Sequence, residues 1–173
     1  PGKRAVLGHM TDDERRQVFA NLAWCQFTFD EMASGLAWQT LLPQTAKGII
    51  NSDMSESERT IALYRMMHRG PKMFRGNSIK GHLEAVAGLV KKYGAETLLD
   101  YGSGKGAQYD ELKLHERWGG VKPTCYDPGY PPIAQKPKGA FDGVICTDVA
   151  EHVPEVGIDA FLADVIGYAR KFA

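Results

Sequence analysis

The sequence lacks both a net charge and long apolar runs. Lysine and arginine together number 21, as do aspartate and glutamate, so the formal charge is zero. Without a global basic field, the chain is not expected to attract nucleic acid or an anionic membrane surface. No apolar run has the length of a membrane span, and the basic N-terminus has no hydrophobic segment of the signal-peptide kind. We therefore expect no membrane partner.

Cysteine is also scarce. Cys25, Cys125 and Cys146 are the three in the chain, and their odd number and wide spacing fit neither a disulfide framework nor a zinc site. Cys125 and Cys146 lie inside apolar runs that read as strands, so they are predicted to be inert, buried thiols. This usage favours a reducing, cytoplasmic location.

What is present is enough apolar material for a core, with 43% hydrophobic residues in a chain of 173. That length favours one domain with a small extension. Residues 1–53 are predicted to form a helical extension or cap, because Thr11 and Glu14 match a capping box and apolar residues then recur at helical spacing. Its aromatic residues favour a homodimer or a larger assembly through these helices. Residues 54–173 are predicted to form the main domain.

Within the main domain, helical and strand patterns alternate. Ser55 and Glu58 form a second capping box, which opens a helix to about His68. The order that follows is helix, strand, helix, strand, loop, strand and helix, at residues 79–93, 97–101, 107–118, 121–126, 128–139, 141–147 and 158–173. Such alternation is typical of a parallel sheet. The predicted fold class is α/β, a Rossmann-like three-layer sandwich with a mainly parallel sheet, preceded by N-terminal helices.

A glycine-rich loop joins the first strand of this pattern to the following helix. Glycine permits positive φ and lets backbone N–H groups approach a ligand, and the helix N-terminus favours negative charge. Gly102, Gly104 and Gly106 are spaced by two, so they match neither the dinucleotide fingerprint nor a P-loop, and Lys105 is not followed by a hydroxyl residue. A nucleotide-binding oxidoreductase is therefore disfavoured. Asp100 would repel a diphosphate but could receive an ammonium group, directly or through water.

Asp127 closes the second strand. A carboxylate there can accept two hydrogen bonds from ribose hydroxyls. Asp127-Pro128-Gly129 could instead be only a turn. Considered alone, this segment favours neither the ligand interpretation nor the turn interpretation. Because a glycine loop precedes it in the sequence, the ligand interpretation is favoured.

Three segments resemble motifs of the class I S-adenosylmethionine-dependent methyltransferases. They are residues 100–106 (DYGSGKG), residues 126–127 (YD) and residues 141–153 (FDGVICTDVAEHV), in the order that the family has them. The resemblance covers about residues 78–173. It implies S-adenosylmethionine as cofactor and S-adenosylhomocysteine as product. It further implies that the methionine part lies against Asp100, Gly102, Ser103, Gly104 and Gly106, the ribose against Asp127, and the sulfonium and substrate near Thr147 and Asp148.

The sequence departs from the family in two places. Only residues 128–140 are available where the family has a helix and a third strand, so the third strand is expected to be abbreviated. Adenine would then be held by Tyr130, Ile133 or loop backbone. The pattern also ends with a helix at residue 173, so the C-terminal strands of the family are expected to be missing. Residues 75–78 could fold over the cofactor or form a capped helix entry.

The segment Asp148-x-x-Glu151-His152 allows three interpretations. On a helical turn these side chains share a face, and they resemble the Glu-x-x-Glu-His metal motif of some ubiquinone-pathway and small-RNA methyltransferases, with Asp148 in place of the first glutamate. His152 could instead be a general base for an acceptor hydroxyl. Glu151 and His152 could also merely shape a surface turn before Pro154. We assign His152 and Asp148 as candidate catalytic residues and no residue as a metal ligand.

The predicted function is methyl transfer from S-adenosylmethionine to a small-molecule acceptor. One alternative is a non-catalytic module that binds the cofactor within a larger assembly. Another is a metal-assisted RNA 2′-O-methyltransferase, in which a divalent metal would act at the Asp148 segment.

Overall fold

The computed structural model describes residues 48–70 and 73–173. Its helices are α3 (Glu56–Met67), α4 (Leu83–Tyr93), α5 (Ala107–Asp110) and α6 (Ile158–Gly167). Its strands are β1 (Leu98–Tyr101), β2 (Thr124–Tyr126), β3 (Phe141–Ile145) and β4 (Ala169–Phe172). The predicted helices of residues 1–47, and the assembly through them, lie outside the described residues.

The strands form one four-stranded sheet in the order β2-β1-β3-β4. All three pairings are parallel, and Leu99 of β1 lies opposite Thr124 of β2 and Val144 of β3. The predicted α/β fold with a parallel sheet is therefore confirmed.

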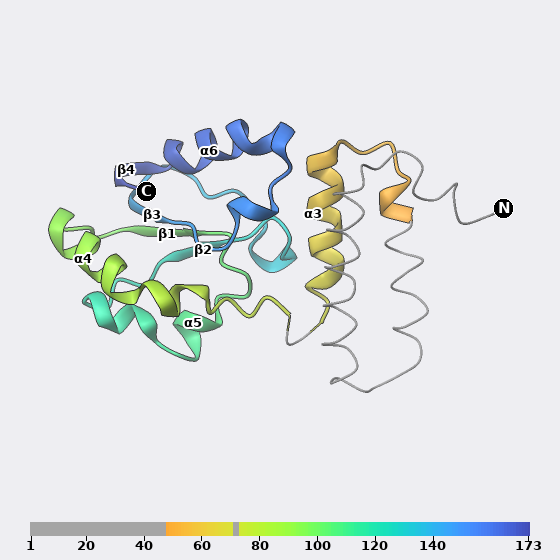
Figure 1. The fold of residues 1–173 in the computed structure, drawn as a ribbon. Coiled ribbons are helices and arrows are strands. Elements are labelled where there is room, and N and C mark those ends of the chain that lie inside the picture. Colours follow the sequence, from red (N-terminus) through yellow and green to blue (C-terminus); the bar gives the residue numbers. More distant parts are fainter. Residues whose placement is uncertain (1–47, 71–72) are drawn as a thin grey trace.

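Helices cover both faces of the sheet (Figure 1). On one face, Val86 and Val90 of α4 pack with Leu98 and Ile145. On the other, Val165 of α6 packs in the cluster that contains Leu99 and Val144. Successive residues of a strand point to opposite faces, so β1 contributes to both cores, and all four of its residues are buried.

The prediction of one continuous helix over residues 107–118 is wrong. Helix α5 ends at Asp110, Lys113 has a left-handed φ of 50°, and a separate 3-10 helix spans Leu114–Trp118. Tyr109 and Trp118 are both buried in the core under α4. On one continuous helix, residues nine apart would lie about half a turn from each other. The break lets both rings enter the same core.

The predicted helix over residues 158–173 is also wrong at its end, because one of the strands that were expected to be missing is present. Helix α6 ends at Gly167, and Ala169–Phe172 is strand β4, which pairs with β3. The Phe172 ring lies directly over Gly143, where a Cβ would come within 2.2 Å of it. A glycine in β3 thus makes room for the neighbouring strand's aromatic ring.

The connection between β2 and β3 is short and irregular, as predicted. Among residues 128–140, all of them described, the structure has one 3-10 helix, Pro131–Ile133, and no strand. Strand β2 begins only at Thr124, directly after Pro123. Proline cannot donate to a ladder, which explains the shortened strand.

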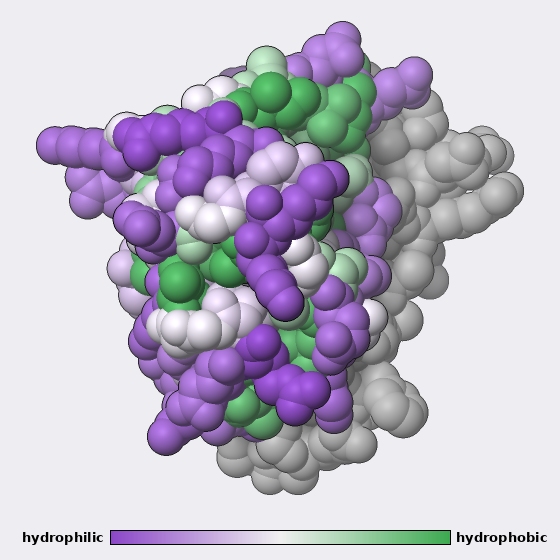
Figure 2. All heavy atoms as spheres, turned by 90° about the vertical axis from the view of Figure 1, so that its left-hand side faces the viewer, coloured by the Kyte–Doolittle hydropathy of each residue, from purple (hydrophilic) through white to green (hydrophobic). Residues whose placement is uncertain are grey.

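The surface opposite the carboxyl edge of the sheet is mostly hydrophilic (Figure 2). An apolar patch lies at its upper rim on the side of α6, whose Leu162 and Ile166 are exposed. No helix in the described part of the chain is both long and apolar enough to cross a membrane. Cys125 and Cys146 are free thiols, and burial raises their pKa to about 11 and about 12.

Candidate functional site

The glycine loop, residues 102–106, follows β1 at the carboxyl edge of the sheet (Figure 1). Gly102, Gly104 and Gly106 have positive φ angles of 82°, 59° and 69°. Strand β1 has β2 on one side and β3 on the other, so the loop lies where the strand order reverses. In open α/β sheets, ligands bind at this kind of position.

The chain itself packs tightly around the glycines. A Cβ on Gly104 would lie 2.4 Å from the Phe74 carbonyl oxygen, and one on Gly102 would lie 2.3 Å from Val149 Cγ2. Phe74 precedes the sheet and Val149 follows β3. The loop is therefore held between two distant parts of the chain, and each glycine is required by that packing as well as by its φ angle.

Backbone N–H groups of the loop donate within the protein. The segment 74–76 lies alongside the loop and the start of α5, and its carbonyl groups accept one N–H of the loop and two of α5, at distances of 2.8, 2.8 and 2.9 Å: Lys105 N to Phe74 O, Ala107 N to Arg75 O, and Gln108 N to Gly76 O. Gly102 N and Ser103 N donate to Tyr126 O of β2. The backbone of residues 75 and 76 thus lies on the glycine loop and the start of α5. That this segment folds over a cofactor stays a prediction.

Asp127 directly contacts the glycine loop. Its Oδ2 accepts the Gly104 N–H at 2.9 Å, and its Oδ1 accepts the Gly129 N–H at 2.8 Å. The hydrogen bond from Gly129 closes the turn that the sequence allowed. The hydrogen bond from Gly104 joins two of the predicted motifs, the glycine loop and the acidic end of β2. Burial raises the pKa of Asp127, and the backbone hydrogen bonds oppose that rise. Each carboxylate oxygen keeps a further lone pair that a hydroxyl could use.

Asp100 lies beneath the loop. It is 1% exposed, and its Oδ2 accepts hydrogen bonds from Gln108 Nε2 and the Tyr109 hydroxyl, both at 2.7 Å. Burial raises its pKa to about 6. At this burial an ammonium group could not contact Asp100 directly, and a contact through water stays a prediction. Asp100 instead fastens α5 to β1, and the predicted ligand residue Ser103 is buried as well, at 2% exposure.

The third motif lies on the other side of Gly102. The Thr147 hydroxyl is hydrogen-bonded to the Ser78 hydroxyl at 2.9 Å. Asp148 is exposed with a left-handed φ of 55°, and a 3-10 helix, Ala150–His152, begins only after it. Asp148 therefore does not share a helical face with Glu151 and His152, which corrects the premise of the metal interpretation. In the described residues, no three His, Cys, Asp or Glu side chains are grouped to hold a metal ion.

His152 is half-buried at the same edge. Its ring centroid lies 5.6 Å from that of Tyr64, and its Nδ1 is buried with no hydrogen-bond partner among the described residues.

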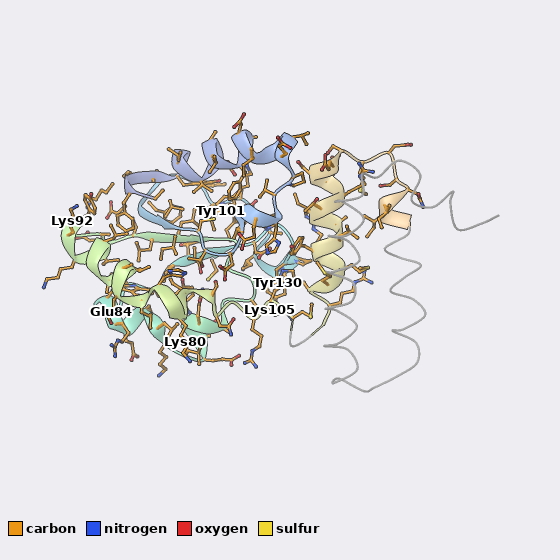
Figure 3. All side chains as sticks on the ribbon, viewed as in Figure 1. Lys80, Glu84, Lys92, Tyr101, Lys105 and Tyr130 are labelled. Atoms are coloured by element: carbon orange, nitrogen blue, oxygen red, sulfur yellow. The ribbon has the colours of Figure 1, made fainter. Side chains whose placement is uncertain are left out.

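An aromatic group from α3 completes the site, and sequence reasoning missed it. His68 is 5% exposed, stacks on Tyr130 at a centroid distance of 5.2 Å, and places Nε2 3.7 Å from Asp127 Oδ1. Burial, helped by the charge of Lys105, lowers its pKa to about 4. Lys105 and Tyr130 lie together at the foot of α3 (Figure 3), with the amine 5.9 Å from the ring centroid. The available signal was that Tyr64 and His68 are four apart on one helix.

The structure thus brings Gly102, Gly104, Asp127, Thr147 and His152 to one edge and leaves Asp100 below it. Comparisons of the chain with protein families, with curated proteins and with solved structures found no match.

Proposed function

We propose that the chain binds S-adenosylmethionine at the carboxyl edge of a Rossmann-like sheet and transfers its methyl group to a small-molecule acceptor. The observation that carries the proposal is the hydrogen bond from Gly104 N to Asp127 Oδ2. It joins the loop and the acid, 23 residues apart, that the sequence assigned separately to the same cofactor. A turn alone would not require that contact.

The residues at this edge fit an adenosyl cofactor. Asp127 is fixed by two backbone N–H donors, so its remaining lone pairs are oriented for a pair of ribose hydroxyls. The loop residues Gly102 and Gly104 have no Cβ, which lets Val149 and the Phe74 carbonyl pack against the loop beside Asp127. Tyr130 offers an aromatic face next to Asp127 in place of the absent third strand.

The chemistry asked of the protein is modest. The cofactor supplies a methyl group already activated by its sulfonium, so the chain contributes proximity and orientation. Thr147 and Asp148, which follow β3, would position the acceptor. His152, half-buried at the same edge, would take the proton from an acceptor hydroxyl as the oxygen–methyl bond forms.

Calorimetry with S-adenosylhomocysteine, S-adenosylmethionine and NAD tests the proposal. We expect both adenosyl sulfur compounds to bind and NAD not to bind. Transfer of labelled methyl groups to a small-molecule extract should fall about a hundredfold in His152→Gln, with S-adenosylhomocysteine affinity retained. Binding of NAD alone, or transfer only to RNA with a metal requirement, would contradict it.

A further inference from the structure

Helix α3 lies across the carboxyl edge of the sheet and contacts two of the loops that make the site (Figure 1). A Cβ on Gly129, in the loop after β2, would lie 2.9 Å from the Tyr64 Cβ. In the segment after β3, a Cβ on Gly157 would lie 2.7 Å from the Ser57 hydroxyl oxygen, and the Tyr64 ring lies against His152. The helix therefore bridges the loops on either side of the glycine loop.

The C-terminal end of α3 covers Asp127. The side chain of His68 is 2% exposed and that of Asp127 is 13% exposed, with 3.7 Å between His68 Nε2 and Asp127 Oδ1. The His68 Nδ1 is buried and has no hydrogen-bond partner among the described residues. A ribose could not reach the Asp127 carboxylate while the imidazole stays in this place.

The contacts that hold α3 are separate from the cores of the sheet. The buried residues Met66, Met67 and Met73 form a cluster of their own, which in the described part of the chain includes no strand residue. Among the described residues, the other contacts of α3 and of residues 68–70 include hydrogen bonds from Arg65 Nε to the Pro128 carbonyl at 3.1 Å and from the Lys105 amine to the Gly70 carbonyl. They also include ring contacts of Tyr64 and His68 with Phe74, Tyr130 and His152, all of which lie outside the strands. Moving α3 would therefore leave both cores of the sheet intact.

We propose that α3 is a lid, and that His68 occupies the place of the ribose on Asp127 until the helix moves away. This regulation rests on the proposed function, because it concerns the same carboxylate. The apparent affinity for the cofactor is then the intrinsic affinity reduced by the fraction of molecules with the lid open.

A disulfide that fastens the lid tests the proposal. Ser57→Cys with Gly157→Cys would place a sulfur near the position of the Ser57 oxygen, 2.7 Å from the new Cβ, close to the separation that a disulfide needs. Cys25→Ser provides the background, and burial keeps Cys125 and Cys146 protonated. We expect the oxidised protein to bind S-adenosylhomocysteine at least about tenfold more weakly than the reduced protein. Equal affinity in both states would overturn the lid, and the two single variants should show no redox effect.

His68→Ala gives an independent measurement. We expect it to bind S-adenosylhomocysteine about threefold or more tightly than the unsubstituted chain, because the competitor for Asp127 is removed. The matched control is Arg69→Ala, an exposed neighbour, which should leave affinity unchanged. Weaker binding in His68→Ala would overturn the lid by making His68 a ligand contact. If even His68→Ala does not bind S-adenosylhomocysteine, the proposed function itself is overturned. If the oxidised disulfide variant binds it as tightly as the reduced variant, only the lid is overturned.

Discussion

At the scale of single residues, the two aspartates of the site have different partners. Asp100 accepts hydrogen bonds from two side chains of α5 and is closed off from solvent. Asp127 accepts from two backbone N–H groups of different loops. The first arrangement fixes one element to another, whereas the second orients a carboxylate at the carboxyl edge of the sheet, beneath His68. We therefore propose a structural role for Asp100 and a binding role for Asp127.

Asp100→Asn should stabilise the protein at neutral pH. Burial raises the pKa of Asp100 from 3.8 to about 6, so the folded state holds its proton more tightly than the unfolded state. Its contribution to stability is complete below about pH 4 and is lost as the pH rises through about 6. Asparagine can still accept both hydrogen bonds without ionising.

Urea unfolding at two pH values measures this effect. We expect Asp100→Asn to exceed the parent chain by about 1–3 kcal/mol at pH 7.5, and the difference to shrink toward zero near pH 4. A difference that is the same at both pH values would show that ionisation of Asp100 is not its cause.

At the scale of elements, the glycine loop is constrained twice, by its own φ angles and by the segment that covers it. Gly104 and Gly119 both have positive φ, but only Gly104 faces a neighbour, the Phe74 carbonyl. Gly119, at the end of the 3-10 helix, has open space around the position of a Cβ. Alanine substitutions at these two glycines therefore distinguish the cost of a strained φ angle from the cost of steric overlap.

Gly104→Ala should therefore destabilise the protein more than Gly119→Ala. Left-handed φ costs an alanine about 1–2 kcal/mol at either position. At Gly104 the overlap adds to that cost, because backbone must move, and we expect a total of about 3 kcal/mol or more. Denaturant midpoints of the two variants, measured side by side, decide the matter. Equal losses would mean that segment 74–76 does not press on the loop.

The elements that could be predicted are those that local sequence determines. The capping box of Ser55 and Glu58 forms as expected, with Ser55 Oγ accepting the Glu58 N–H at 3.3 Å, and α3 ends within a residue of the predicted position. Strand β4 and the break after α5 depend on distant partners, such as Gly143 beneath Phe172. In the site, the loop and Asp127 were predicted from motifs. The cover of Asp127 by His68 depends on residues about sixty positions apart. The spacing of Tyr64 and His68 places the two on one side of the helix but does not indicate what they contact.

At the scale of the whole molecule, the connection between β2 and β3 is held without a helix or strand of its own. The Lys136 amine donates to Asp164 of α6 at 2.8 Å, and the Tyr101 hydroxyl of β1 donates to the same carboxylate at 2.7 Å. The Tyr168 hydroxyl donates to the Pro137 carbonyl at 3.2 Å. These bonds tie the later part of the connection to α6 and Tyr168, and tie α6 to the central strand.

The convergence of separate loops on Asp127 is the central claim, and S-adenosylhomocysteine binding by Asp127→Ala tests it most directly. The control is Asp110→Ala, which removes an exposed carboxylate of α5 that pairs with Lys122. Two hydrogen bonds from ribose to a charged group lead us to expect about a hundredfold loss of affinity in Asp127→Ala and no change in Asp110→Ala, with unfolding curves confirming that both variants are folded. Unchanged affinity in a folded Asp127→Ala variant would contradict the account.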